Sequence, residues 1–301
     1  MKMTDAGIEL VVCGSSARGM PTFAAWEAEV LEHTLDYVDY ISIHTYFNNR
    51  DDDTLKYLSR PDETNDFIKA VVATCDHTAA KLKSPKQINL SFDEWNVWYH
   101  STQQDRDIEP WISPRPINED IYNMEDVLVV GGMLNTLLNN ADRVKIACIA
   151  QTVNVIAPIM TVKGGDAWAQ TTYYPFEQVS KYGRGTVLRQ QVESQGYDLV
   201  NRKNVPWLSS SCVLNDDGCL TLFAINRHPD EPMDLRVILE SFEPRNVLWF
   251  ERMSHSDPKA TNSAVNPLNV VPTRSDRAEI VDGTLVAHLE PLSWNVIRIS
   301  D

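Results

Sequence analysis

The first 150 residues alternate between short apolar runs rich in β-branched residues and longer amphipathic stretches, which constrains the fold more than any other feature. The apolar runs predict four strands, a buried one at 8–13 and three more at 40–44, 87–92 and 144–150. The amphipathic stretches predict three helices, at 23–37, 63–82 and 118–140. Continuous apolar strands that alternate with helices are typical of a parallel sheet covered on both faces, with right-handed crossovers.

Four such units are too few to close a (β/α)8 barrel, so the chain holds either half of a barrel or an open doubly wound sheet. Polar or aromatic residues follow the C-terminal end of every predicted strand, where barrel enzymes build their active sites. These residues are Ser15 and Ser16, His44 and Tyr46, Asp93 to Asn96, and Gln151 with Asn154. This pattern favours the C-terminal half of a (β/α)8 TIM barrel, and the open sheet remains the alternative.

The hydrophobic pattern changes near Val187: from there on, short apolar runs are separated by clusters of turn residues. The sequence Asn-Asp-Asp-Gly at 215–218 is a strong hairpin signal, and 261–274 is predicted to form a long loop. This pattern is typical of an antiparallel β-sandwich. We predict a partial barrel at residues 1–183 and a C-terminal β-sandwich at residues 184–301.

The composition excludes several classes of function. A net charge of -15 and a pI of about 4.9 argue against nucleic acid, since contact with phosphates needs clustered Lys and Arg. No run of 18 apolar residues is present, so no membrane span is expected. The five scattered cysteines predict free thiols in a reducing compartment.

The pair Gly131-Gly132 lies inside a predicted helix and indicates close packing rather than a phosphate cradle.

The sharpest local feature is the run SFDEWNVWY at 91–99, in which an apolar strand ends in two adjacent carboxylates. Because side chains alternate along a strand, only one of Asp93 and Glu94 is expected to face the barrel axis. A carboxylate on a rigid strand end beside aromatic rings suits attack on the anomeric carbon of a sugar. A solvated strand end with tryptophans in the core explains the same residues equally well.

Two further groups follow neighbouring strands. His44 and Tyr46 share one face of an extended segment, so the Tyr46 hydroxyl can hold the carboxylate of a nucleophile. A histidine at a strand end is also often a satisfied core residue. Gln151 and Asn154 could donate to sugar hydroxyls, or could cap their loop.

These runs resemble glycoside hydrolase family 51, the α-L-arabinofuranosidases. The resemblance covers essentially the whole chain in unbroken order. Its motifs include SFDEWNVWYH, IELVVCGSS, DYISIHTY, ADRVKIACIAQTVNVIAPIMT and PLSWNVIRI. It implies strands five to eight of the barrel, followed by the sandwich. It places Glu94 on the nucleophile, and assigns His44, Tyr46, Trp98 and Gln151 to substrate binding.

The family's acid/base glutamate, in an Asn-Glu pair ending the fourth barrel strand, has no match here. The one Asn-Glu pair of the chain, Asn118-Glu119, is predicted to open a helix instead. The resemblance therefore implies a C-terminal fragment of a retaining enzyme, whose two carboxylates lie about 5–5.5 Å apart. We expect this chain alone to be inactive and poorly soluble.

The resemblance also implies substrates and partners. It predicts hydrolysis of terminal non-reducing α-L-arabinofuranosyl residues of arabinan and arabinoxylan oligosaccharides, in the cytoplasm. It predicts a homo-oligomer, hexameric in the family, with no metal or organic cofactor. Two alternatives remain: a related β-xylosidase or endoglucanase on the same fold, and a non-catalytic carbohydrate-binding or assembly module.

Overall fold

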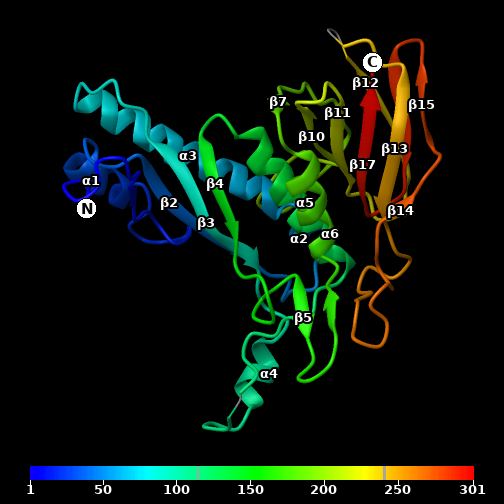
Figure 1. Ribbon diagram of the computed structural model, residues 1–301, viewed down its shortest axis with the longest axis horizontal. Helices are drawn as coiled ribbons and strands as arrows, with labels where there is room; N and C mark the ends of the chain where they lie inside the picture. Colours follow the sequence, from blue (N-terminus) through cyan, green and yellow to red (C-terminus); the bar gives the residue numbers. More distant parts are fainter. Residues whose placement is uncertain (114, 240–241) are drawn as a thin grey trace. The chain divides into compact units, whose positions relative to one another are not determined.

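The computed structural model describes residues 1–113, 115–239 and 242–301 (Figure 1). The chain divides into two compact units. The first comprises residues 1–47, 62–96 and 140–150, and the second comprises 48–61, 97–139 and 151–301. The predicted boundary between a partial barrel at 1–183 and a sandwich at 184–301 stays a prediction.

The first unit is built on a four-stranded sheet in the order β1-β2-β3-β4. Its strands are β1 (Val11–Val12), β2 (Tyr40–Phe47), β3 (Asn89–Val97) and β4 (Val144–Ile149). β1 pairs with β2, and β3 with β4, in parallel. The spatial order follows the chain order without reversal. An open doubly wound sheet reverses its order at a switch point, so the barrel half is the better description.

Two helices of the first unit alternate with its strands along the chain, as predicted: α1 (Ala25–Thr34) and α3 (Arg60–Lys81). The side chains of Phe67, Ile68, Val71 and Cys75 are all buried, as the spacing of one helix face requires. The Phe67 ring lies 6.3 Å from the ring of Phe92 on β3 in an edge-to-face arrangement. The apolar face of α3 therefore packs against the sheet strand that carries the carboxylate pair.

The second unit contains two antiparallel sheets, as predicted. One has the order β14-β13-β17-β11-β10-β7 and the other the order β12-β16-β15. The strands of the larger sheet are β7 (Thr186–Leu188), β10 (Leu208–Leu214), β11 (Leu220–Asn226), β13 (Asn246–Met253), β14 (Thr273–Arg274) and β17 (Ser293–Ser300). Those of the smaller sheet are β12 (Met233–Ile238), β15 (Ala278–Val281) and β16 (Thr284–Leu289). Leu222, Phe250, Leu285 and Ile297 belong to one buried apolar cluster, which both sheets share.

Helix α5 (Met124–Asn139) packs against the larger sheet of the second unit, on β10, β11 and β17. Gly131 makes this close approach possible, because a Cβ there would lie 2.5 Å from the ring of Trp294. A Cβ on Gly132 would lie 2.8 Å from Pro61. The prediction that the two glycines form a packing point is confirmed.

The remaining elements of the second unit are short. They are helices α2 (Thr54–Leu58), α4 (Thr102–Asp107) and α6 (Tyr173–Tyr182), and strands β5 (Ile159–Thr161), β6 (Ala167–Ala169), β8 (Gly196–Tyr197) and β9 (Val205–Pro206). The hairpin predicted at 215–218 joins β10 to β11, and Gly218 takes a positive φ of 81°. The predicted loop at 261–274 ends in the short strand β14.

Several predicted element boundaries are wrong. The first strand shrinks to Val11–Val12, and β3 extends five residues beyond the predicted 87–92. The first strand is also not buried as predicted: Val11 is 44% exposed, because β1 is an edge strand of its sheet. Helix α5 begins at Met124 and not at residue 118, so Asn118-Glu119 does not open it. The reason is local: the Asn123 side chain accepts from the Asp126 amide (3.2 Å), and the Asp126 carboxylate accepts from the Asn123 amide (2.8 Å). This reciprocal capping fixes the start of the helix after Asn123.

All five cysteines are free, as predicted, and burial raises the pKa of the Cys75 thiol to about 12. Within the described residues, no helix combines the length and apolar character needed to cross a membrane.

Candidate active site

The carboxylate pair lies at a local irregularity of β3. Phe92 pairs with Ala147 of β4, but the next pairing joins Trp95 to Ile149, so two residues of β3 oppose one residue of β4. An extra residue of this kind is a β-bulge, which interrupts the alternation of side chains. Asp93 and Glu94 both reach the His44 ring as a result. The expectation that strict alternation would let only one of them point to the site is wrong at this position.

Glu94 is held by two residues of β2. The Tyr46 hydroxyl donates to Oε1 of Glu94 at 2.5 Å, and Nδ1 of His44 lies 3.7 Å from Oε2 of the same carboxylate. The side chain of Glu94 is 44% exposed, so the carboxylate is fixed in orientation and still reachable from solvent. The expected grouping of a carboxylate with His44 and Tyr46 is present.

Asp93 contacts the opposite edge of the same histidine. Its Oδ1 lies 2.9 Å from Nε2 of His44, and its Oδ2 accepts from the Ser91 hydroxyl at 3.2 Å. Asp93 therefore fixes the His44 ring, whose other nitrogen faces Glu94.

The Tyr46 hydroxyl keeps its proton over the whole physiological range. Its pKa lies well above the usual value, because of burial and because of its hydrogen bond to Glu94. A phenol that stays protonated is a permanent donor to the carboxylate. The contact therefore orients Glu94.

Neighbouring residues hold the bulged strand in place. Trp95 and Asn96 are fully buried. The Asn96 amide donates to the Ala150 carbonyl at 2.6 Å, and the Ala150 amide donates to the Trp95 carbonyl at 3.0 Å. The core explanation is therefore correct for Trp95, which anchors the strand end.

Trp98, Gln151 and Asn154 belong to the second unit. The Trp98 indole nitrogen donates to Oδ1 of Asn118 at 3.2 Å, and the residue is 41% exposed. Gln151 is also exposed. Asn154 accepts from the Thr161 amide (2.8 Å) and donates to the Thr161 hydroxyl (3.0 Å), which favours the loop-capping explanation for this residue.

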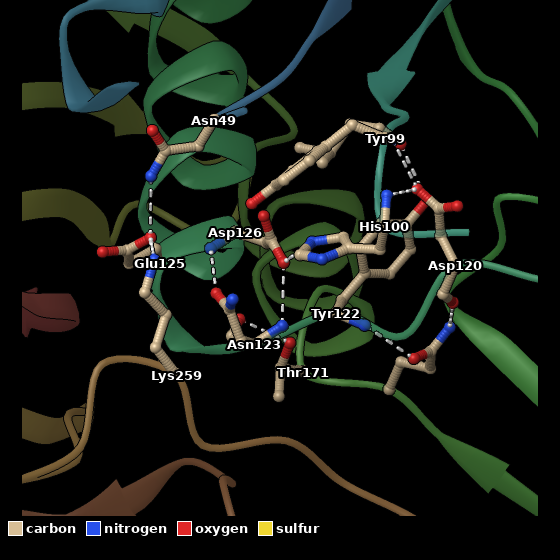
Figure 2. A network of polar contacts seen from close by, with 12 residues as sticks. Asn49, Tyr99, His100, Asp120, Tyr122, Asn123, Glu125, Asp126, Thr171 and Lys259 are labelled. Atoms are coloured by element: carbon tan, nitrogen blue, oxygen red, sulfur yellow. Dashed lines mark hydrogen bonds and ion pairs between the residues drawn. The ribbon is translucent and has the colours of Figure 1, made fainter. Parts of the chain in front are cut away.

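A buried polar network in the second unit was not predicted from the sequence (Figure 2). Its centre is three fully buried carboxylates, those of Asp120, Glu125 and Asp126. Glu125 accepts from Nζ of Lys259 at 2.8 Å and from the Thr54 hydroxyl at 2.5 Å. The one signal in the sequence was the capping pattern Asn-x-x-Asp at 123–126.

Asp126 accepts three hydrogen bonds. The donors are the Tyr57 hydroxyl (2.7 Å), the His100 ring nitrogen Nε2 (2.8 Å) and the Asn123 amide (2.8 Å). Burial alone would lower the pKa of His100, but the charge and hydrogen bond of Asp126 outweigh it and raise the pKa above the usual value. Across the described residues, no cluster of three or more His, Cys, Asp or Glu side chains has the geometry of a metal site.

Comparison with known proteins decides the family. A family model described as the α-L-arabinofuranosidase C-terminal domain matches residues 93–293, more than half of the chain. The chain belongs to this family. The α-L-arabinofuranosidase match spans the end of β3 with its carboxylate pair, helix α5 and nearly all of the sandwich.

Several known proteins share much of the sequence. An intracellular exo-α-(1→5)-L-arabinofuranosidase of Bacillus subtilis is 52% identical over 99% of this chain. An exo-α-(1→6)-L-arabinofuranosidase of Bifidobacterium longum is 37% identical over 99% of it. The chain spans only 60% and 59% of the length of these two relatives.

Solved α-L-arabinofuranosidase structures share the fold. A family 51 enzyme from Bifidobacterium longum superposes with a TM-score of 0.93 at 31% identity, over all of this chain and 61% of that one. An α-L-arabinofuranosidase from Thermotoga maritima gives a TM-score of 0.81 at 24% identity, over 99% of this chain and 58% of that one. The predicted fold, the C-terminal half of a (β/α)8 barrel followed by an antiparallel β-sandwich, is confirmed.

Proposed function

We propose that this chain is the nucleophile-bearing portion of a retaining exo-α-L-arabinofuranosidase, and that Glu94 is the nucleophile. The observation that carries the proposal is the Glu94 carboxylate itself. Tyr46 donates to one of its oxygens at 2.5 Å and His44 lies beside the other at 3.7 Å, while the side chain stays open to solvent. A nucleophile of this kind must be oriented and accessible, and Glu94 meets both requirements.

The proposed reaction is a double displacement. Glu94 attacks the anomeric carbon as a second carboxylic acid protonates the leaving oxygen, and water then hydrolyses the arabinosyl ester with that second group acting as base. Tyr46 keeps one oxygen of Glu94 engaged, so the other is directed at the sugar. Asp93 holds the His44 ring beside the nucleophile.

The second carboxylate is proposed to come from a part of the protein that this chain does not span. The relatives are longer by about two fifths of their length. The separation of the two carboxylates should be about 5–5.5 Å, the distance that favours retention. General acid catalysis contributes about 10²–10⁴-fold, so the chain alone should be inactive.

The proposed substrates are arabinan and arabinoxylan oligosaccharides with terminal non-reducing α-L-arabinofuranosyl residues. The names of the relatives include both (1→5) and (1→6) linkages. Trp98 and Gln151 are proposed substrate-binding residues on the family resemblance alone. A cytoplasmic location, a homo-oligomeric state and the division at residues 183 and 184 belong to the same proposal.

The test complements the chain with the portion of the Bacillus subtilis relative that it does not span. We expect the chimera to hydrolyse p-nitrophenyl α-L-arabinofuranoside and the 301-residue chain to be inert. Glu94→Ala should abolish turnover in the chimera, while Glu193→Ala, at an exposed position, should leave it unchanged.

Transfer to methanol tests the stereochemistry. Proton NMR of the first-formed product should show methyl α-L-arabinofuranoside, which requires two inversions at the anomeric carbon. A first-formed β product, or full activity after Glu94→Ala, would overturn the assignment of Glu94.

A further inference from the structure

The segment at the end of β3, Val97 to Ser101, is held by buried side chains, and one carboxylate holds its last three residues. Asp120 accepts the backbone N–H groups of three consecutive residues, from Tyr99 at 2.8 Å, His100 at 3.0 Å and Ser101 at 2.9 Å (Figure 2). Asp120 is fully buried. Hydrogen bonds from backbone amides to an ionised carboxylate are among the strong ones in proteins, and here three converge on a single group.

Asp120 is itself held in place by a buried amide. Gln170 is fully buried, donates to the Asp120 carbonyl at 2.9 Å and to the Ala157 carbonyl at 2.7 Å, and accepts from the Tyr122 amide at 3.0 Å. One buried side chain therefore holds the backbone from Asp120 to Tyr122.

Two further contacts hold the same segment. The Tyr122 hydroxyl donates to the Val97 carbonyl at 2.9 Å, at the last residue of β3. The His100 ring is hydrogen-bonded to Asp126 and lies with its centroid 4.0 Å from that of Tyr99. Four of the five residues from Val97 to Ser101 are thus tied down by buried side chains.

The fifth residue, Trp98, is the one left exposed. The residue is 41% exposed although its neighbours are held on both sides, and its indole nitrogen donates to Asn118. Burying a carboxylate has a large desolvation penalty, which the three amide hydrogen bonds offset. In a solvated loop, water would accept hydrogen bonds from the same three amides and the backbone could move. With Asp120 as the acceptor, the backbone next to Trp98 is held in one conformation.

We infer that Asp120 is a positioning residue for Trp98, which it fixes as a preformed aromatic platform for a sugar ring of the substrate. This inference rests on the proposed function for its ligand, a sugar ring that packs on an indole face. The rigidity of the platform is independent of that function and can be measured on its own.

The first experiment uses the complemented chimera labelled with 5-fluorotryptophan, with the Trp98 resonance assigned through Trp98→Phe. In the unmodified chimera, Trp98 should give one sharp ¹⁹F line. Asp120→Ala should broaden or split that line alone, and should speed amide hydrogen exchange in 99–101 by about 10–100-fold. Asp216→Ala, at an exposed turn residue, is the matched control.

The second experiment measures kinetics in the complemented chimera. Asp120→Ala should raise KM for an arabino-oligosaccharide about ten-fold with a smaller change in kcat. In a Trp98→Ala background, the Asp120 substitution should have no further effect on KM, because Asp120 acts through Trp98.

The outcomes separate positioning from general support of the fold. An unchanged Trp98 line, a uniform change in all tryptophan lines, or additive losses in KM would overturn the inference. If Asp120→Ala does not fold, Asp120→Asn keeps the side-chain shape and one acceptor oxygen, and should give the same local effects in weaker form. If the chimera proves inactive, the proposed function fails while the fluorine and exchange results still decide the rigidity of the platform.

Discussion

The substitution Gly131→Ala gives a sharp test of how the second unit is packed. Gly131 lies on the face of α5 that meets Trp294 of β17. An alanine Cβ there would lie 2.5, 2.8 and 3.2 Å from three carbons of the Trp294 ring. Ordinary carbon–carbon contacts are about 3.5–4 Å, so the ring or the helix must move by about 1 Å.

The Trp294 ring has little freedom to move. It is fully buried, its indole nitrogen donates to the Gln178 side chain of α6 at 2.7 Å, and it stacks on Phe223 with the centroids 5.8 Å apart. Overpacking of this kind destabilises by about 1–3 kcal/mol. Alanine regains about 1 kcal/mol of helix propensity over glycine. Two carbons of the Trp294 ring would lie within 3 Å of the new Cβ, and the ring cannot easily move away. We therefore expect a net loss of about 1–2 kcal/mol in the free energy of unfolding.

Thermal unfolding followed by near-ultraviolet circular dichroism measures this loss. For a unit of this size, about 1 kcal/mol corresponds to about 2–4 °C, so Tm should fall by about 2–8 °C. Gly19→Ala is the control, because a Cβ at Gly19 meets nothing within 4 Å and should leave Tm within about 1 °C. A Gly131→Ala chain that melts at or above the unmodified Tm would refute the reasoning, since propensity would then outweigh packing.

Three further predictions concern charged and polar contacts. Lys259→Met removes the cation beside buried Glu125 and should lower the free energy of unfolding by about 1–3 kcal/mol, less than for a fully buried pair because Lys259 is 43% exposed. Adding Glu125→Gln should restore part of the lost stability in denaturant unfolding, and a purely additive loss would contradict the pairing. Because folding raises the pKa of His100, the stability that this residue contributes is complete below its unfolded pKa of about 6.5 and is lost as pH rises through the folded pKa. His100→Gln should therefore flatten the dependence of Tm on pH in that window, and an unchanged slope would argue against the charged pair. Tyr46→Phe in the complemented chimera should lower kcat/KM by about 10–100-fold, the value of one hydrogen bond to a charged group, and an unaffected rate would remove Tyr46 from the proposed mechanism.

Much of the fold was predictable because it depends on patterns that are local in the sequence. Apolar runs separated by amphipathic stretches predicted four parallel strands, and turn clusters after Val187 predicted the sandwich. Boundaries were less accurate, because they depend on capping contacts such as the Asn123–Asp126 pair. The first strand was too long in the prediction because apolar character alone does not show which residues find a hydrogen-bonded neighbour.

The candidate site was predictable in its residues but not in its geometry. A carboxylate after one strand and a His-x-Tyr pattern in the strand before it were enough to group Glu94, His44 and Tyr46. The role of Asp93 was missed, because the bulge depends on pairing with β4, which lies about 50 residues further along the chain. The buried carboxylates at 120, 125 and 126 were also missed, since acidic residues around the start of a helix usually remain solvated.

The sequence by itself determined the order and type of the strands, the close-packing glycines and the residue types that can attack a sugar, because periodicity, turn chemistry and side-chain chemistry are properties of short segments. The tertiary structure decided which of these residues meet. The bulge turns both carboxylates toward one histidine, and a long loop from the sandwich brings Lys259 to a carboxylate that is 134 residues away in the chain. Such contacts form only when the backbone is folded, because they depend on which buried polar groups are left without water and must find a partner within the protein.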